Sequence, residues 1–174
     1  MKYRTLSLFL VVLLIGAFTS CEKSDRDVIG EVEFYLLEDF VTVNETPEIE
    51  LASVVLTEDP LLVYSDLTFY NAREHYFNVT DRAKEKIEGM EHSVSGKAFA
   101  VTANREVVYT GYFVPAYSSA SVQWIVIDPI FWHLTNRMDV NLGYPGQFEG
   151  IEIPDLRNDE RILKIFRRDR KLKE

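Results

Sequence analysis

The sequence predicts a single α+β domain, built on a mainly antiparallel sheet with a short middle helix and a C-terminal helix on one face. Several short segments alternate apolar and polar residues with the period of a β-strand. Two further segments combine a helix cap with an apolar stripe, and short connections join the elements. The composition, 47% hydrophobic and 27% charged, is that of a packed globule and excludes disorder as the main state.

The first half of the chain is expected to be mostly extended. Strands are predicted at 31–37 and 49–56, where apolar residues alternate with polar ones before running together. The sequence Glu-Asp-Pro at 58–60 ends the second strand, because the residue before a proline avoids the helical region. A single helical turn is predicted to begin at Ser65 or Asp66.

The middle helix has the clearest end signals. A strand is predicted at 75–79, and a helix follows at 81–88. Thr80 is a good N-cap because its hydroxyl oxygen can accept a hydrogen bond from the first helical turn. Gly89 is expected to end the helix.

Residues 99–113 are predicted to form a β-hairpin, because apolar residues alternate on both sides of Asn104-Arg105. Arginine disfavours the positive φ that a two-residue hairpin turn requires, so the turn signal is weaker than Asn-Gly. Together with the preceding strand and helix, the hairpin gives a β-α-β-β unit over 75–113.

The last third is predicted as a polar loop at 117–121, a buried strand at 122–127, a Gly/Pro-punctuated segment at 142–150 and a final helix. Asn158 or Asp159 is the expected cap of that helix. Its apolar stripe consists of Ile162, Leu163 and Phe166.

The N-terminus has the pattern of a secretory signal: Lys2 and Arg4, then the short apolar run 6–18. Phe18-Thr19-Ser20-Cys21 resembles a bacterial lipobox, which implies cleavage before Cys21 and lipidation of that cysteine. The alternative is an ordinary secreted protein whose only cysteine falls at the cleavage site. The predicted organisation is therefore a signal peptide at 1–20, a lipidated Cys21 with a flexible tether at 21–30, and one domain at 31–174 with a basic C-terminal tail.

Two resemblances extend this organisation. As a whole the chain is similar to small Bacteroidetes-type lipoproteins, which implies a cell-envelope location, either facing the periplasm or exposed on the outer membrane. The stretch from Asp66 to Tyr109 resembles the β-α-β-β core of the periplasmic head in SecD-type export subunits. That resemblance implies a fold and transfers no catalytic residue.

The charge is distributed unevenly along the mature chain. Residues 22–160 carry 10 Lys/Arg and 26 Asp/Glu, so 10 − 26 = −16, whereas residues 161–174 carry 7 and 2, so 7 − 2 = +5. The acidic body argues against nucleic acid as a partner, because phosphates would be repelled. The basic end could bind an anionic surface or an acidic partner, or its cations could simply complement the dipole of the last helix.

No catalytic or metal-binding pattern is recognisable in the sequence. His75, His92 and His133 have no partner at metal-ligand spacing, and one cysteine cannot form a Cys-based zinc site. There is no Gly-x-Ser-x-Gly elbow and no P-loop. We therefore expect no catalytic residue, no metal, no cofactor and no enzymatic activity.

The candidate contact surface consists of Tyr112, Phe113, Tyr117 and Trp124, which lie around the polar loop. Aromatic rings beside small polar residues are typical of recognition surfaces, although aromatics at strand spacing also build cores. The expected function is a membrane-anchored, non-enzymatic module that binds or assembles an envelope protein. The alternative is an accessory lipoprotein that binds a small molecule or a glycan.

Overall fold

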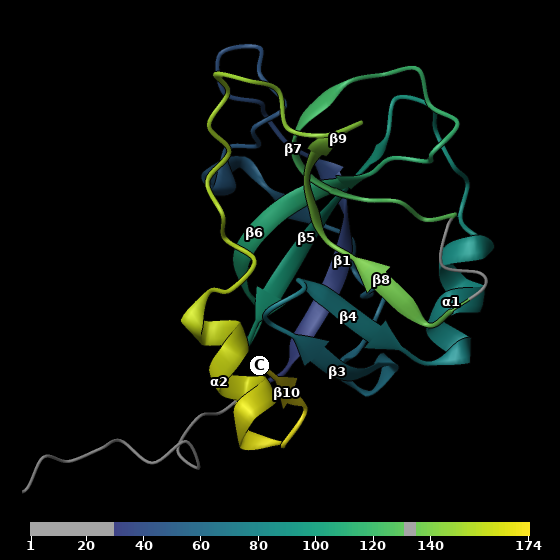
Figure 1. Ribbon diagram of the computed structural model, residues 1–174, viewed down its shortest axis with the longest axis vertical. Helices are drawn as coiled ribbons and strands as arrows, with labels where there is room; N and C mark the ends of the chain where they lie inside the picture. Colours follow the sequence, from purple (N-terminus) through teal and green to yellow (C-terminus); the bar gives the residue numbers. More distant parts are fainter. Residues whose placement is uncertain (1–29, 131–134) are drawn as a thin grey trace, which may run out of the picture.

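The computed structural model describes residues 30–130 and 135–174, which form two β-sheets and two α-helices (Figure 1). The predicted signal peptide at 1–20, Cys21, the predicted tether up to residue 29, and His133 lie outside the described residues. The helices are α1 (Asp81–Glu88) and α2 (Glu160–Arg168). The strands are β1 (Val32–Asp39), β2 (Val55–Leu56), β3 (Leu67–Asn71), β4 (Tyr76–Val79), β5 (Lys97–Ala103), β6 (Glu106–Phe113), β7 (Val122–Ile127), β8 (Arg137–Asp139), β9 (Asn141–Tyr144) and β10 (Leu172–Lys173).

The predicted α+β class is confirmed, with two mostly antiparallel sheets in place of one. The larger sheet has the order β2-β1-β5-β6-β7-β9, and the smaller one the order β10-β3-β4-β8. Within these sheets β6 pairs with β7, and β10 with β3, in parallel. β10 lies about a hundred residues after β3, whereas only residues 114–121 connect β6 to β7, fewer than the dozen or so that a parallel connection commonly takes.

The two sheets are connected beside their shared core. Val140 alone separates β8 from β9, so one continuous strand at 137–144 pairs with β4 in the small sheet and with β7 in the large sheet. Phe34 of β1 also exchanges two backbone hydrogen bonds, at 2.9 and 3.2 Å, with Leu62, which lies outside both sheets in the segment that leads to β3.

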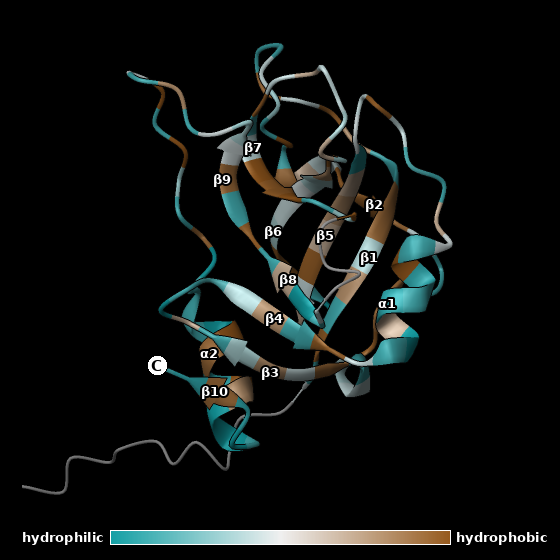
Figure 2. Cartoon of the chain, turned by 45° about the vertical axis from the view of Figure 1, so that its right-hand side comes forward, coloured by the Kyte–Doolittle hydropathy of each residue, from teal (hydrophilic) through white to brown (hydrophobic). Residues whose placement is uncertain are grey.

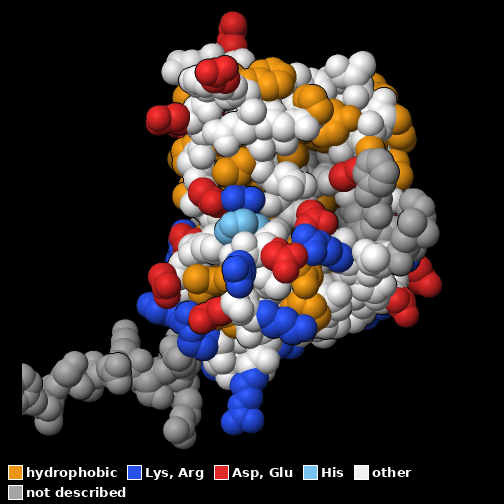
Figure 3. All heavy atoms as spheres, viewed as in Figure 1, with side chains coloured by type: hydrophobic (Ala, Val, Ile, Leu, Met, Phe, Trp, Pro, Cys, Tyr) orange, Lys and Arg blue, Asp and Glu red, His pale blue; other side chains and the backbone are white. Residues whose placement is uncertain are grey.

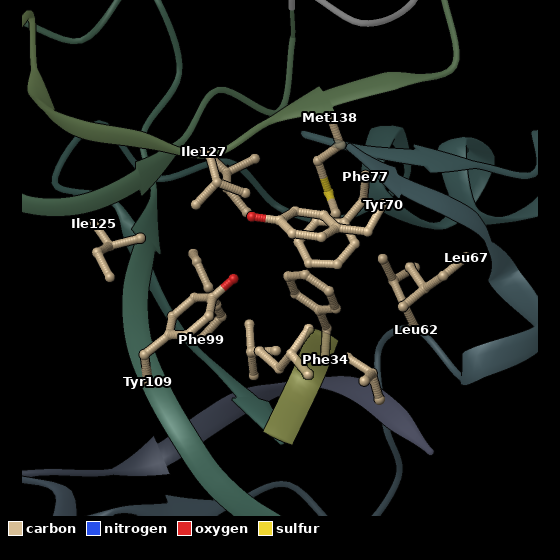
Figure 4. Packing of buried hydrophobic residues seen from close by; sticks show 14 of the residues in the cluster. Phe34, Leu62, Leu67, Tyr70, Phe77, Phe99, Tyr109, Ile125, Ile127 and Met138 are labelled. Carbon is tan, nitrogen blue, oxygen red and sulfur yellow. The ribbon is translucent and has the colours of Figure 1, made fainter. Parts of the chain in front are cut away.

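Aromatic side chains from both sheets fill the space between them (Figure 4). Phe34 of the large sheet meets Phe77 of the small sheet edge-on, with ring centroids 5.2 Å apart. Tyr70 lies against the other side of Phe77 at 4.4 Å, and Phe99 contacts Phe34 at 5.8 Å. Hydrophobic residues accordingly concentrate along β1, β5 and β7 (Figure 2).

Both helices begin at a residue that the sequence singles out. The Thr80 hydroxyl accepts a hydrogen bond from the Ala83 amide at 3.2 Å, and α1 buries Ala83 and Ile87. The Asp159 carboxylate accepts from the Arg161 amide at 2.8 Å at the start of α2. The helices lie at opposite ends of the small sheet (Figures 1 and 2).

The predicted hairpin is present as β5 and β6. Asn104 and Arg105 have φ values of 53° and 66°, the left-handed pair that a type I′ turn uses. The order strand, helix, hairpin over 75–113 is also present, but β4 belongs to the small sheet and β5 and β6 to the large one. The strand at 67–71, the two at 137–144 and the short β10 are additions to the predicted set.

Candidate functional site

Two loops lie at the end of the molecule away from α2 (Figure 1), and both expose apolar side chains to solvent. We call these segments, 114–121 and 145–151, the distal loops. Tyr117 is 61% exposed, Phe148 46% and Ile151 41%. A single exposed apolar residue is ordinary, whereas a group of them on neighbouring loops marks a candidate interaction site.

Hydrogen bonds fix the first distal loop to the rest of the fold. The buried Ser118 hydroxyl donates to the Val94 carbonyl, and the Tyr144 hydroxyl donates to the Ala116 carbonyl at 2.8 Å. The Ser118 carbonyl also lies 3.1 Å from the Tyr144 oxygen. Tyr117 is therefore presented from a backbone that is tethered on both sides of it.

A single glutamine side chain fixes the second distal loop. Gln123, on β7, donates from Nε2 to the Gly146 carbonyl at 2.9 Å and accepts from the Phe148 amide at 2.8 Å. Gln147 donates to the Ile151 carbonyl at 2.7 Å. Phe148 and Ile151 are consequently held on an ordered loop next to the start of β7.

Glycine is needed where β9 turns into this loop. Gly143 has φ = 77°, and a Cβ there would lie 2.8 Å from the Gln147 nitrogen and from Gly146 backbone atoms. Any other residue would be strained and would collide with the loop backbone.

An open depression of about 350 Å³ lies between β9 and the first distal loop. Val114 and Ala116 line one side, and Asn141 and Leu142 line another. Asp128 also lines it, and its carboxylate accepts a hydrogen bond from the Ile130 amide at 2.9 Å. The volume is at the lower end of the range for small-molecule sites.

The four predicted contact residues are not brought together at the surface. Of these, Tyr117 is exposed, and Tyr112 is half-buried with its ring edge-on to Phe40 at 6.3 Å. Phe113 and Trp124 are only 1% and 5% exposed, so both belong to the core. The indole nitrogen of Trp124 donates to the Thr110 hydroxyl at 3.3 Å, which satisfies its polar atom inside the protein.

Sequence reasoning did not select Phe148 and Ile151. The glycines and the proline around them predict a loop. A predicted loop does not indicate which of its apolar side chains are buried and which are exposed. The only available signal was an aromatic residue within a Gly/Pro-punctuated segment, which is a weak one.

The most buried charge in the described chain lies at α1. Asp66 is fully buried, and its carboxylate binds Arg82 and Lys86, with Lys86 Nζ at 3.2 Å. Burial alone would raise the pKa of Asp66, but hydrogen bonds from Arg82, the Val63 amide and Lys86 lower it below its usual value. This carboxylate stays ionised and fully bonded, as in a structural ion pair.

A second polar group lies inside the core, around two tyrosines. The Tyr70 hydroxyl lies 2.9 Å from both the Arg157 carbonyl and Asn158 Oδ1, whereas the Tyr109 hydroxyl is fully buried without a partner among the described groups. Burial raises the pKa of Tyr109 well above 10. Burial also lowers the pKa of His75, assisted by the nearby Arg157. The two tyrosines and His75 therefore stay neutral at physiological pH.

Within residues 30–130 and 135–174, no three His, Cys, Asp or Glu side chains gather as they would around a metal ion. Neither helix of the described chain is long and apolar enough to cross a membrane. Figure 3 shows one face of the molecule, on which apolar side chains lie mostly over the upper part, Lys and Arg lie in the middle and lower parts, and Asp and Glu are spread over all of them.

In comparisons with known proteins, no family model, no curated protein and no solved structure matches the chain.

Proposed function

We propose that this protein is a lipid-anchored lipoprotein of the bacterial cell envelope, attached through Cys21, whose domain binds an envelope protein without catalysing a reaction. The signal-like N-terminus and the lipobox resemblance support the anchor. The observation that carries the binding role is the exposure of Tyr117, Phe148 and Ile151 on the distal loops.

The hydrogen bonds under these loops favour binding. Aromatic side chains contribute a large contact area while losing little rotamer freedom. The backbone that carries them is already ordered by Ser118 and Gln123, so little loop entropy remains to be lost on association. Tyr112, half-buried at the end of β6, can contribute only at the margin of such a surface.

The test is an in-cell crosslink and pull-down of the full-length lipidated protein from its native membrane. We expect a stoichiometric protein partner whose recovery falls about tenfold or more in Tyr117→Ala/Phe148→Ala, because contact residues of this kind often contribute over 1.4 kcal/mol. Val55→Ala is the matched control, since Val55 is as exposed as Phe148 but lies on β2, at the opposite edge of the large sheet from β9.

Unchanged recovery in a folded double variant would overturn the distal loops as the contact surface. Loss of the partner in Val55→Ala alone would move the contact to the β2 edge. Recovery of the protein without any partner would contradict the binding role itself.

The depression beside β9 favours a second candidate, binding of a small molecule or glycan, with Tyr117 as a neighbouring stacking ring. Isothermal calorimetry of the full-length protein against a sugar panel tests it. Heat that appears with the wild type and disappears in Leu142→Trp, which fills the depression, would support this function. Absence of heat in the wild type would contradict it.

A further inference from the structure

The described chain begins beside the basic C-terminal helix. Arg168, at the end of α2, donates a hydrogen bond from Nη1 to the Gly30 carbonyl at 3.0 Å. The hairpin turn lies at the same place, because the Asn104 amide donates to the Glu31 carbonyl at 2.9 Å. Gly30, the first described residue, therefore lies beside α2, and the distal loops lie at the other end of the domain (Figure 1).

This end of the domain carries exposed cations. Lys164, Arg167, Arg170 and Lys173 are all exposed. Among the described residues, no acidic side chain pairs with Lys164, Arg170 or Lys173, and Arg167 meets only Glu174, at 3.4 Å. Lys173 lies over the Phe69 ring at 3.4 Å, which leaves its charge at the surface.

The other cations of the segment are occupied within the fold. Arg161 pairs with its neighbour Asp159, and Arg168 with Asp169. The Lys171 ammonium binds the Leu67 carbonyl at 2.8 Å and lies over the Tyr64 ring. Residues 161–174 carry a net charge of +5 against −16 for residues 22–160. Glu31 and Glu160 are outside that count and reduce the charge around it, Glu31 through its attraction to Arg168 and Lys171.

The helix dipole does not account for these positions. A cation gains from the dipole only within the last turn of a helix. Lys164 lies in the middle of α2, and Arg170 and Lys173 lie beyond its end. An anionic partner outside the domain explains three exposed cations at one end of a strongly acidic protein better than the helix dipole does.

The length of the tether limits what that partner can be. Eight residues lie between Cys21 and Gly30, so the chain from one to the other spans about 30 Å at full extension. If the proposed acyl anchor holds Cys21 at the bilayer, this end of the domain stays near the headgroups at high effective concentration. Charge attraction to anionic lipids acts within about one Debye length, roughly 8 Å in physiological salt, which the tether easily permits.

We propose that the basic end formed by α2 and β10 is a docking face for anionic phospholipid headgroups of the membrane that anchors Cys21. This inference rests on the proposed lipid anchor. Docking orients the domain with α2 toward the bilayer and the distal loops away from it. Each exposed cation is expected to contribute about fivefold to the preference for the docked orientation.

The test uses the full-length lipidated protein in vesicles of phosphatidylcholine, with and without added phosphatidylglycerol. A dye is attached through Gly146→Cys, on a distal loop where a side chain meets no atom within 4 Å, and energy transfer to labelled headgroups is measured. We expect lower transfer on the anionic vesicles, and high salt should abolish the difference. In Lys164→Glu/Arg170→Glu we expect the preference for the docked orientation to fall by about an order of magnitude or more. The difference in energy transfer between the two vesicle types should then disappear.

Lys84→Glu/Lys97→Glu is the control, because it changes the net charge equally on α1 and at the start of β5. Equal transfer on both vesicle types, or an equal loss in the control variant, would overturn the docking face. An acidic protein partner at this end would likewise leave lipid composition without effect. Mass spectrometry of Cys21 distinguishes failure of the lipid anchor from failure of the docking face. An unmodified Cys21 would contradict the anchor, and with it the docking that depends on the anchor, whatever the vesicle experiment shows.

Discussion

Arg82 on α1 holds the buried carboxylate of Asp66 with two donors, Nε at 2.9 Å and Nη2 at 2.5 Å, both directed at Oδ1. The Val63 amide and Lys86 bind the other oxygen at 3.2 Å each. One carboxylate thus ties α1 to the turn that precedes β3. Because three hydrogen-bonding partners surround this fully buried carboxylate, removing its charge should lower the free energy of unfolding.

Asp66→Asn is expected to lower the free energy of unfolding by about 1–3 kcal/mol at neutral pH, because charge-assisted hydrogen bonds become neutral or are lost. Since the folded-state pKa is below the ordinary 3.8, this stabilisation is complete above the unfolded pKa and disappears as the pH falls through the folded pKa. Urea unfolding from pH 7 down to pH about 2 measures it. A constant gap between wild type and variant over that range would contradict the assignment.

The two core tyrosines should respond in opposite ways to removal of the hydroxyl. Tyr109→Phe is expected to leave the stability unchanged or raise it by up to about 1 kcal/mol, because the buried hydroxyl has no described partner. Tyr70→Phe should lower the stability by about 1–2 kcal/mol, because it removes a bond to the segment before α2. Thermal and urea unfolding of both variants provide the comparison, and a larger loss for Tyr109→Phe would show that its hydroxyl is satisfied.

Gly111 is expected to tolerate no side chain. A Cβ there would lie 2.5 Å from the Phe99 ring and 2.7 Å from the Ile125 carbonyl. Gly111→Ala should therefore lower the free energy of unfolding by about 1–3 kcal/mol or more, as overpacking does. Gly146→Ala, where the space is open, should stay within about 0.5 kcal/mol of the wild type. Equal midpoints for the two variants in urea would contradict the packing at β6.

Ser118→Ala should loosen the first distal loop. The variant loses the hydrogen bonds that the Ser118 hydroxyl makes with the Val94 carbonyl and the Ala120 amide, at a cost of about 1–2 kcal/mol. We expect faster proteolytic cleavage within 114–121 and weaker partner recovery, because Tyr117 is no longer presented from an ordered backbone. Ser119→Ala is the neighbouring control, and similar cleavage rates for the two variants would show that Ser118 does not hold the loop.

Local signals predicted the local structure well. Thr80 and Asp159 cap their helices as expected, since capping involves residues only two or three positions apart. The hairpin forms at Asn104-Arg105 despite the positive φ of the arginine, because pairing along β5 and β6 outweighs the cost of one turn residue. The strand β10 was not predictable: its two residues pair with β3, about a hundred residues earlier in the chain.

The contact residues were harder to predict because both faces of the large sheet are covered. All residues of β5 except Lys97 are buried, so alternation there does not separate an inner face from a solvent face. The Trp124 indole is buried on this sheet and donates a hydrogen bond to the Thr110 hydroxyl. Its position in the sequence of β7 is compatible with either face of the strand. Tyr117 lies on a loop that is held by hydrogen bonds of the adjacent residues Ala116 and Ser118, and its own side chain stays accessible to solvent.

The continuous strand at 137–144 has a consequence for unfolding. Its first half belongs to the ladder with β4 and its second half to the ladder with β7, and the buried Val140 joins them with an amide bonded to the His75 carbonyl. Neither sheet can separate from the core without disturbing a strand of the other. Amide hydrogen exchange should therefore find one cooperative unit, with β4 and β7 opening together at the same free energy.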